Sequence, residues 1–277
     1  MMIAHSSFLF HPPSRQKGFT LVEMIVVMII TGIIGGMVAM FIRAPMQGYV
    51  DSARRANMTD IADTALRRIT RDLRLSLPNS VVVTGTCDGA ATTCFLDFLA
   101  TTGGGRYRAG AGGTNNALDF TMADTSFEVL GAMPVLAAND QIVVYNLGIP
   151  GADAYLNDNR ATYSANAGGV ITFAAGKKFP FESPGQRFQV VHEQVRYICD
   201  PAAHTLMRYW GFPIATPSAA VPASGSSALL ATNVGACKFT YDPLVSARNG
   251  LVTLNLGIAE SGETVTLYSA AHVSNVP

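Results

Sequence analysis

The stretch Gly18-Phe19-Thr20-Leu21-Val22-Glu23-Met24-Ile25 opens an apolar run that continues to Ile42 and decides how this chain begins to fold. The nineteen residues 24–42 carry no charge. A helix needs about 20 predominantly apolar residues to cross the hydrocarbon of a bilayer. We therefore predict a membrane-spanning helix over residues 19–42.

Charged residues occupy two unusual places around this segment. Arg15 and Lys17 come directly before Gly18, and Glu23 lies inside the apolar segment. A carboxylate near membrane depth costs roughly 3 kcal/mol unless it finds a partner. A secretory signal peptide instead ends its apolar core with a cleavage site of small residues. Here the charges and the glycine precede the core, which argues against a cleaved secretory leader or a plain signal anchor.

The junction Gly18-Phe19-Thr20-Leu21-Val22-Glu23, followed by an apolar helix, resembles the type IV prepilin class. The resemblance implies a leader of residues 1–18, cleavage between Gly18 and Phe19 by a prepilin peptidase, and N-methylation of the new amine of Phe19. It also implies that Glu23 pairs with the N-terminal amine of a neighbouring subunit. In a medium of low dielectric constant an ammonium group and a carboxylate each need the other, and this amine exists only after cleavage.

Beyond Ile42 we expect the helix to continue to Leu77. Apolar residues recur there at spacings of three and four, which is typical of a helix packed on a domain. These residues are Ala53, Ala56, Ile61, Ala62, Ala65, Leu66, Ile69, Leu73 and Leu77. Three glycines begin at Gly32, and Pro45 removes a backbone donor, so we expect a bend or local melting between these two residues.

Six arginines on this helical stretch raise the question of a nucleic-acid site. They are Arg54, Arg55, Arg67, Arg68, Arg71 and Arg74. The chain has 19 basic and 19 acidic residues, and without the two basic residues of the leader the balance is 17 to 19, a net charge of −2. Asp63 stands four residues before Arg67, and Arg68 four before Asp72, spacings that favour ion pairs. We therefore expect a solvated, acid-paired helix face and no nucleic-acid binding.

After Pro78 the sequence changes to short β-branched and aromatic runs divided by Gly, Pro, Asn and Asp, which indicates strands and turns. Candidate strands are 80–84, 95–99, 117–120, 141–147, 170–173, 188–191, 195–199, 206–210, 238–241, 251–258 and 264–269. Long loops are expected at 101–116, 150–169 and 213–228. We predict an α+β fold in which a long helix, 19–77, packs on one antiparallel β-rich head domain, 78–277.

The four cysteines all lie in the predicted head. They are Cys87, Cys94, Cys199 and Cys237. They form no Cys-x-x-Cys pair, so a structural zinc site is not expected, and in an extracytoplasmic domain two disulfides are the natural interpretation. Three connectivities are open. We favour Cys87 with Cys94, which closes a small loop, and Cys199 with Cys237, with free buried thiols as the alternative.

Enzyme chemistry finds little support in the sequence. The run His192-Glu193-Gln194-Val195-Arg196 begins like a zinc-protease helix, but an arginine stands where the second histidine is required. We find no nucleophile turn and no phosphate-binding glycine loop. Oxygen ligands at 153–159 could hold calcium, although their spacing matches no EF-hand. We predict no catalytic residue, no metal and no cofactor.

The bulky β-rich head resembles that of a minor pilin or pseudopilin. The runs 41–49, 65–68, 71–74 and 208–211 resemble the minor pilins that act in biogenesis of the mannose-sensitive haemagglutinin (MSHA) pilus. The implied partners are prepilin peptidase, other pilin or pseudopilin subunits and the inner-membrane assembly platform. The implied location is the inner membrane, single-pass, with the C-terminal domain in the periplasm and incorporation into the pilus. The alternatives are a type II secretion minor pseudopilin and a membrane-anchored binding or adhesion module.

Overall fold

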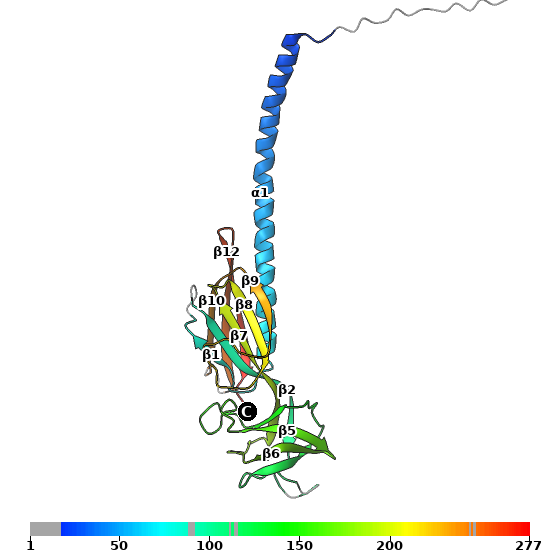
Figure 1. Ribbon diagram of the computed structural model, residues 1–277, viewed down its shortest axis with the longest axis vertical. Coiled ribbons are helices and arrows are strands. Elements are labelled where there is room, and N and C mark those ends of the chain that lie inside the picture. The colour runs from blue at the N-terminus through cyan, green and yellow to red at the C-terminus, as the bar shows by residue number, and fades with distance from the viewer. Residues whose placement is uncertain (1–17, 88–91, 111, 114–115, 244, 246–247) are drawn as a thin grey trace, which may run out of the picture. The chain divides into compact units, whose positions relative to one another are not determined.

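The computed structural model describes residues 18–87, 92–110, 112, 113, 116–243, 245 and 248–277. The chain divides into two compact units, one up to Arg54 and one from Arg55 to Pro277. The helix α1 (Leu21–Leu73) contributes to both units, and the strands belong to the second unit (Figure 1). One long helix and a large antiparallel β domain confirm the predicted α+β class.

The helix differs from its prediction in two ways. It remains helical from Gly32 through Pro45, so the local melting that was expected as an alternative to a bend does not occur: the turns on either side of the missing proline amide keep the helix continuous. It also ends at Leu73 and not at Leu77. Beyond Leu73 the backbone pairs with a strand instead, since the amide of Leu77 donates to the carbonyl of Leu99 at 2.8 Å.

The strands form two sheets, and neighbouring strands within each are antiparallel. A nine-stranded sheet has the order β1-β2-β3-β6-β5-β4-β7-β8-β9, with β2 also paired to β7, and a three-stranded sheet has the order β10-β11-β12. The bounds are β1 (Val82–Gly85), β2 (Cys94–Tyr107), β3 (Asp124–Leu130), β4 (Gln141–Val144), β5 (Arg160–Ala167), β6 (Val170–Lys177), β7 (Arg187–Asp200), β8 (Thr205–Phe212), β9 (Ser226–Thr232), β10 (Val234–Asp242), β11 (Asn249–Glu260) and β12 (Glu263–Ser274).

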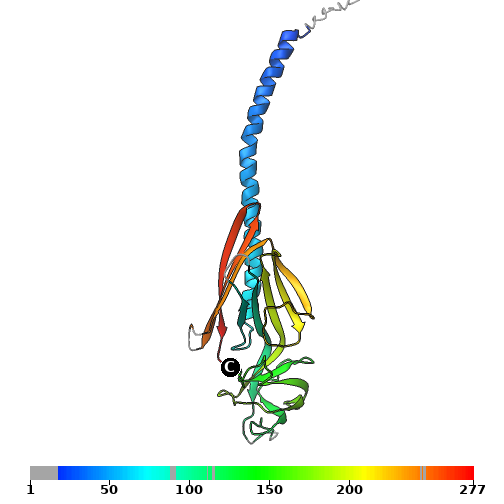
Figure 2. The ribbon, with the colours of Figure 1, turned by 60° about the vertical axis from the view of Figure 1, so that its left-hand side comes forward.

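Two long strands, β2 and β7, pass through two lobes of the second unit. They pair from Cys94 opposite Cys199 to Arg106 opposite Arg187. The half of this ladder near Cys94 and Cys199 belongs to what we call the helix lobe. This lobe also contains the last turns of α1, the strand β1 and the strands β8–β12. The half of the ladder near Arg106 and Arg187, together with β3–β6, forms the outer lobe (Figure 1). In the helix lobe, β12 and β9 lie to either side of the last turns of α1 (Figure 2).

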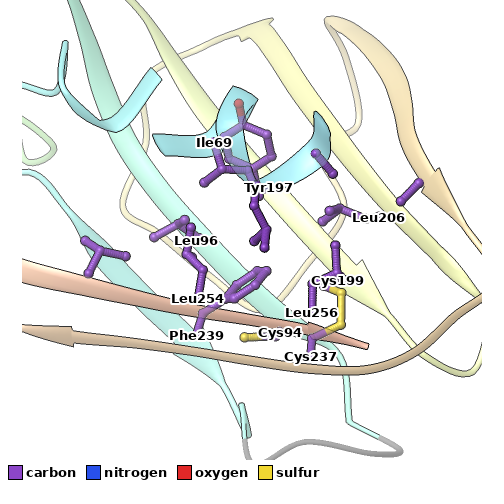
Figure 3. Close-up of a cluster of buried hydrophobic side chains, with 14 of the residues drawn as sticks. Ile69, Cys94, Leu96, Tyr197, Cys199, Leu206, Cys237, Phe239, Leu254 and Leu256 are labelled. Carbon is purple, nitrogen blue, oxygen red and sulfur yellow. A yellow bond between two sulfur atoms is a disulfide. The ribbon is translucent and has the colours of Figure 1, made fainter. Parts of the chain in front are cut away.

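Each lobe has its own apolar core. In the helix lobe, Ile69 of α1 packs with Leu96 and Tyr197 of the first sheet and with Phe239 and Leu254 of the second (Figure 3). The outer lobe is filled mainly by aromatic rings. The ring centre of Phe127 lies 5.1 Å from that of Phe188 and 5.6 Å from that of Phe173. A third cluster, which includes Leu99, Val143 and Tyr155, lies where the lobes join.

Two disulfides lie in the helix lobe. Cys87 is bonded to Cys94, and Cys199 is bonded to Cys237, which are the two pairs favoured from the sequence. The second bond joins β7 to β10 and therefore links the two sheets (Figure 3). A bond between cysteines 38 residues apart contributes about 4 kcal/mol, mainly by restricting the unfolded chain.

Some strand and loop predictions for the head are wrong. The stretch 117–120 is not a strand, because Leu118 and Phe120 fill the core from a loop instead of joining a ladder. The strand of this region is β3, which the prediction missed. The predicted loops at 101–116, 150–169 and 213–228 also contain part of β2, all of β5 and the start of β9.

The glycines of β2 explain why that strand was cut short in the prediction. A Cβ on Gly104 would lie 2.7 Å from the backbone oxygen of Phe188, so only glycine allows β2 and β7 to approach this closely. We expect Gly104→Ala to lower the free energy of unfolding by about 1–3 kcal/mol, as overpacking does. Chemical denaturation measures this. Gly103→Ala is the matched control, because its nearest new contact, Pro134, is 3.5 Å away. Equal losses in both variants would contradict the explanation.

Candidate functional site

The residues on either side of the predicted cleavage point are open to solvent. Gly18 and Phe19 precede the first turn of α1 and lie outside regular secondary structure. Phe19 is 81% exposed, and no atom lies within 4 Å of the place where Gly18 would carry a Cβ. A peptidase could therefore reach this peptide bond. Arg15 and Lys17, with the rest of the predicted leader before Gly18, lie outside the described residues.

Thr20 caps the helix, which the sequence analysis missed. The amide of Glu23 donates to Thr20 Oγ1 at 3.2 Å, and the amide of Met24 donates to the Thr20 carbonyl at 3.2 Å. The signal was present in the sequence, since Thr-x-x-Glu at a helix start is a capping box. Glu23 thus lies in the first helical turn, where a negative charge is favourable to the helix dipole.

The first part of α1 leaves an apolar surface uncovered. Every residue from Phe19 to Ile42 is exposed, and this part of the helix is long and apolar enough to cross a membrane. Thr31, the hydroxyl within it, donates to the carbonyl of Val27 at 2.6 Å and needs no outside partner. Among the described residues, none supplies a partner to the carboxylate of Glu23. This segment can therefore anchor the chain in a membrane or pack with other helices.

The arginines that follow are largely paired with acids, as predicted. The expected pairs form within α1, with N–O distances of 2.5 Å for Arg67–Asp63 and 3.1 Å for Arg68–Asp72. Arg55 also reaches Glu263 at the start of β12, at 2.7 Å. These pairs make the helix face a structural feature of the second unit.

Asp72 ties the end of α1 to the nine-stranded sheet. Its carboxylate accepts hydrogen bonds from Tyr197 Oη at 2.7 Å and from Arg208 Nε at 2.9 Å, in addition to its pair with Arg68. Burial, reinforced by the charge of Asp72, raises the pKa of Tyr197. The guanidinium of Arg208 also lies 4.7 Å from the ring centre of Trp210, a cation–π contact.

A second buried polar group lies on β2 and β7 within the helix lobe. Arg196 Nε and Gln194 Nε2 both donate to Asp97 Oδ1 at 2.8 Å, and the side chain of Asp97 is fully buried. Burial raises the pKa of Asp97 in spite of these hydrogen bonds. Arg196 and Gln194 also bond the backbone of Ala220 and Ala215, so they hold the long connection between β8 and β9 against the sheet.

The loop considered for calcium uses its acids in another way. Asp158 accepts hydrogen bonds from the amides of Gly151 and Asp153, and Asp153 accepts one from Tyr155. These carboxylates stabilise the loop by capping its turns. In the part of the chain that the structure describes, no three His, Cys, Asp or Glu side chains converge on a metal position.

Comparison with known proteins identifies one feature of the chain. Residues 13–41 match the family described as the prokaryotic N-terminal methylation motif. This is the leader type of pilin-like structural subunits, and it implies processing by a prepilin peptidase and assembly with other pilins. No curated protein and no solved structure matches the chain.

Proposed function

We propose that this chain is a minor pilin-like subunit that acts in assembly of an MSHA-type type IV pilus and that it resembles the MSHA biogenesis protein MshO. The methylation motif at residues 13–41 supports the pilin-like part of this proposal, because that motif is a leader type followed by an apolar helix, and the helix here is apolar and long enough to span a membrane. The large two-lobed head supports a role in few copies, since it is bulky for the shaft of a filament.

The proposed course of assembly follows from the anchor. Prepilin peptidase cuts between Gly18 and Phe19 and methylates Phe19. The inner-membrane assembly platform then brings the helix into contact with other pilin or pseudopilin subunits. Packing in the filament replaces lipid around the exposed apolar side chains, and Glu23 gains the N-terminal amine of a neighbour as its partner.

The proposed location is the inner membrane, with a single pass and with the head in the periplasm. The disulfides support this orientation, because such bonds persist in oxidising compartments such as the periplasm and are rare in the cytosol. The mature subunit would enter the pilus with its head on the periplasmic side of the inner membrane.

Mass spectrometry of the mature N-terminus tests the proposal. We expect the purified protein to begin at Phe19 and to carry one extra methyl group on its amine. A terminus at another residue would exclude the pilin-like assignment. Deletion of the gene distinguishes a role in the MSHA-type pilus from a role in type II secretion. Loss of surface pili supports the MSHA role, whereas loss of type II secretion with normal pili would contradict it.

A further inference from the structure

A polar cleft of about 590 Å³ lies where β4 and β5 of the outer lobe meet β7 and β8. Its volume falls within the roughly 300–1,000 Å³ typical of small-molecule sites. The residues that line it include Asn139, Gln141, Arg160, His192, Glu193 and Phe212. No part of the proposed pilus function uses this cleft.

Arg160 is the most unusual group in the cleft. Among the described residues, no carboxylate forms an ion pair with it, although it is half-buried. Within the part of the chain that the structure describes, its guanidinium reaches only Gln141 Oε1 and the carbonyl of Ile214, both at 3.5 Å, the outer limit of a hydrogen bond. Burial lowers the pKa of Arg160. A cation so placed keeps donors available for an anion, and a carboxylate fits the guanidinium fork best.

His192 is held in position beside this cation. Its Nδ1 lies 2.7 Å from Oδ1 of the buried Asp140, whose other oxygen accepts the amide of Ala137. With the Nδ1 proton directed to the carboxylate, Nε2 of the neutral ring is left as a hydrogen-bond acceptor. The side chain of His192 is 48% exposed, so that atom can meet a ligand.

Irregular backbone shapes the cleft on two strands. His192 is the extra residue of a bulge in β7, between Glu193 opposite Ala100 and Val191 opposite Thr101. A second bulge in β8 contains Gly211, whose φ is +71°. Bulges re-aim side chains and are frequent beside binding sites.

The remaining lining groups favour a hydroxylated ring over a simple anion. The ring of Phe212 offers an apolar face. The carboxylate of Glu193 lies 3.9 Å from its nearest cation, Arg208, and can accept hydrogen bonds from hydroxyls. It would also repel a ligand with two negative charges. The side-chain amide of Asn139 adds a donor and an acceptor.

We propose that this cleft binds an acidic monosaccharide unit of the uronic-acid class. Arg160 holds the ligand's carboxylate, Glu193, Asn139 and the Nε2 acceptor of His192 bind its hydroxyls, and Phe212 covers one face of its ring. The inference goes beyond the proposed function, because it concerns the head alone and holds whichever machine the anchor serves.

Titration of sodium D-glucuronate onto the full-length protein in detergent, followed by ligand-observed NMR, tests this site. We expect binding of glucuronate, and weaker binding of D-glucose and of N-acetylglycine by at least about tenfold each, since one lacks the charge and the other lacks the ring. Absence of glucuronate binding would overturn the proposal. Equal binding of D-glucose would do so too, and equal binding of N-acetylglycine would exclude a saccharide site.

Substitutions test whether glucuronate binds in this cleft. Arg160→Gln should weaken glucuronate binding by about tenfold or more, because it removes charge-assisted hydrogen bonds. Arg187→Gln is the matched control, an exposed arginine at the start of β7 outside the cleft, and should leave affinity unchanged. His192→Gln should also weaken glucuronate binding. Because the side chain of His192 is half-exposed, this variant provides an independent test of the site if Arg160→Gln fails to fold. Unchanged affinity in a folded Arg160→Gln or His192→Gln variant would refute the site.

Discussion

Glu23→Gln is expected to leave membrane insertion and leader cleavage intact while lowering incorporation into filaments by at least about tenfold. In the described part of the chain the carboxylate of Glu23 has no side-chain partner, and it lies in a helix whose neighbouring residues are all exposed and apolar. Packing of such helices removes water from the acid, so the positive N-terminal amine of another subunit has to compensate for its charge. Quantitative immunoblots of sheared filaments against membrane fractions measure the ratio.

Glutamine is the informative substitution because Glu23 also stands three residues after the cap Thr20, at the glutamate position of a capping-box sequence. Glutamine serves equally well at this capping position but carries no charge. The complementary control is Thr20→Val, which removes the capping hydroxyl and keeps the charge. We expect it to weaken the first helical turn by about 1 kcal/mol with filaments still formed. If Glu23→Gln filaments match the wild type while Thr20→Val filaments are lost, the acid acts as a cap and charge pairing is not its role.

The sequence was sufficient for the anchor because its signals are local. An uncharged run, a glycine before it and one acid inside it lie within a few helical turns, and the i,i+4 pair of Asp63 and Arg67 follows from helix geometry alone. The methylation motif was found in the same stretch. Thr20 was missed although its signal was equally local.

The head was less predictable because its strands depend on partners far away in the chain. β5 is polar and alternates weakly, yet it becomes a strand because β4 and β6 flank it on both sides. The glycines at the end of β2 are typical of a loop until the approach of β7 is known. The division into two lobes depends on β2 and β7 being long enough to serve both, which no local pattern indicates.

The cleft at the junction shows the same limit more strongly. Arg160 and His192 are 32 residues apart and come together because β4 pairs with both β5 and β7. The bulge that places His192 adds one residue to a ladder, and such a shift has no signal in the sequence. His192 and Glu193 were noted only as part of a failed zinc motif, whereas the structure places them on a strand.

Asp97→Ala is expected to destabilise the head by roughly 3–5 kcal/mol, the cost of leaving a buried ion unpaired. The side chains of Asp97 and Arg196 are 0% and 6% exposed, so water cannot replace the lost carboxylate. Arg196 would keep its bond to Ala220 but lose its charged partner, and Gln194 would lose an acceptor. Urea denaturation of the full-length protein, with its disulfides intact and followed by the fluorescence of its single tryptophan, Trp210, measures the change.

The double variant Asp97→Leu with Arg196→Met separates pairing from packing. Apolar replacement of both members of a buried ion pair is often neutral or stabilising, because neither charge then has to be desolvated. We therefore expect the double variant to recover most of the stability lost in Asp97→Ala, although the connection that Arg196 holds at Ala220 should become more accessible to protease. If Asp97→Ala costs less than about 1 kcal/mol, the range of an exposed pair, then water reaches this site and β2 and β7 are not joined by a dry ion pair there.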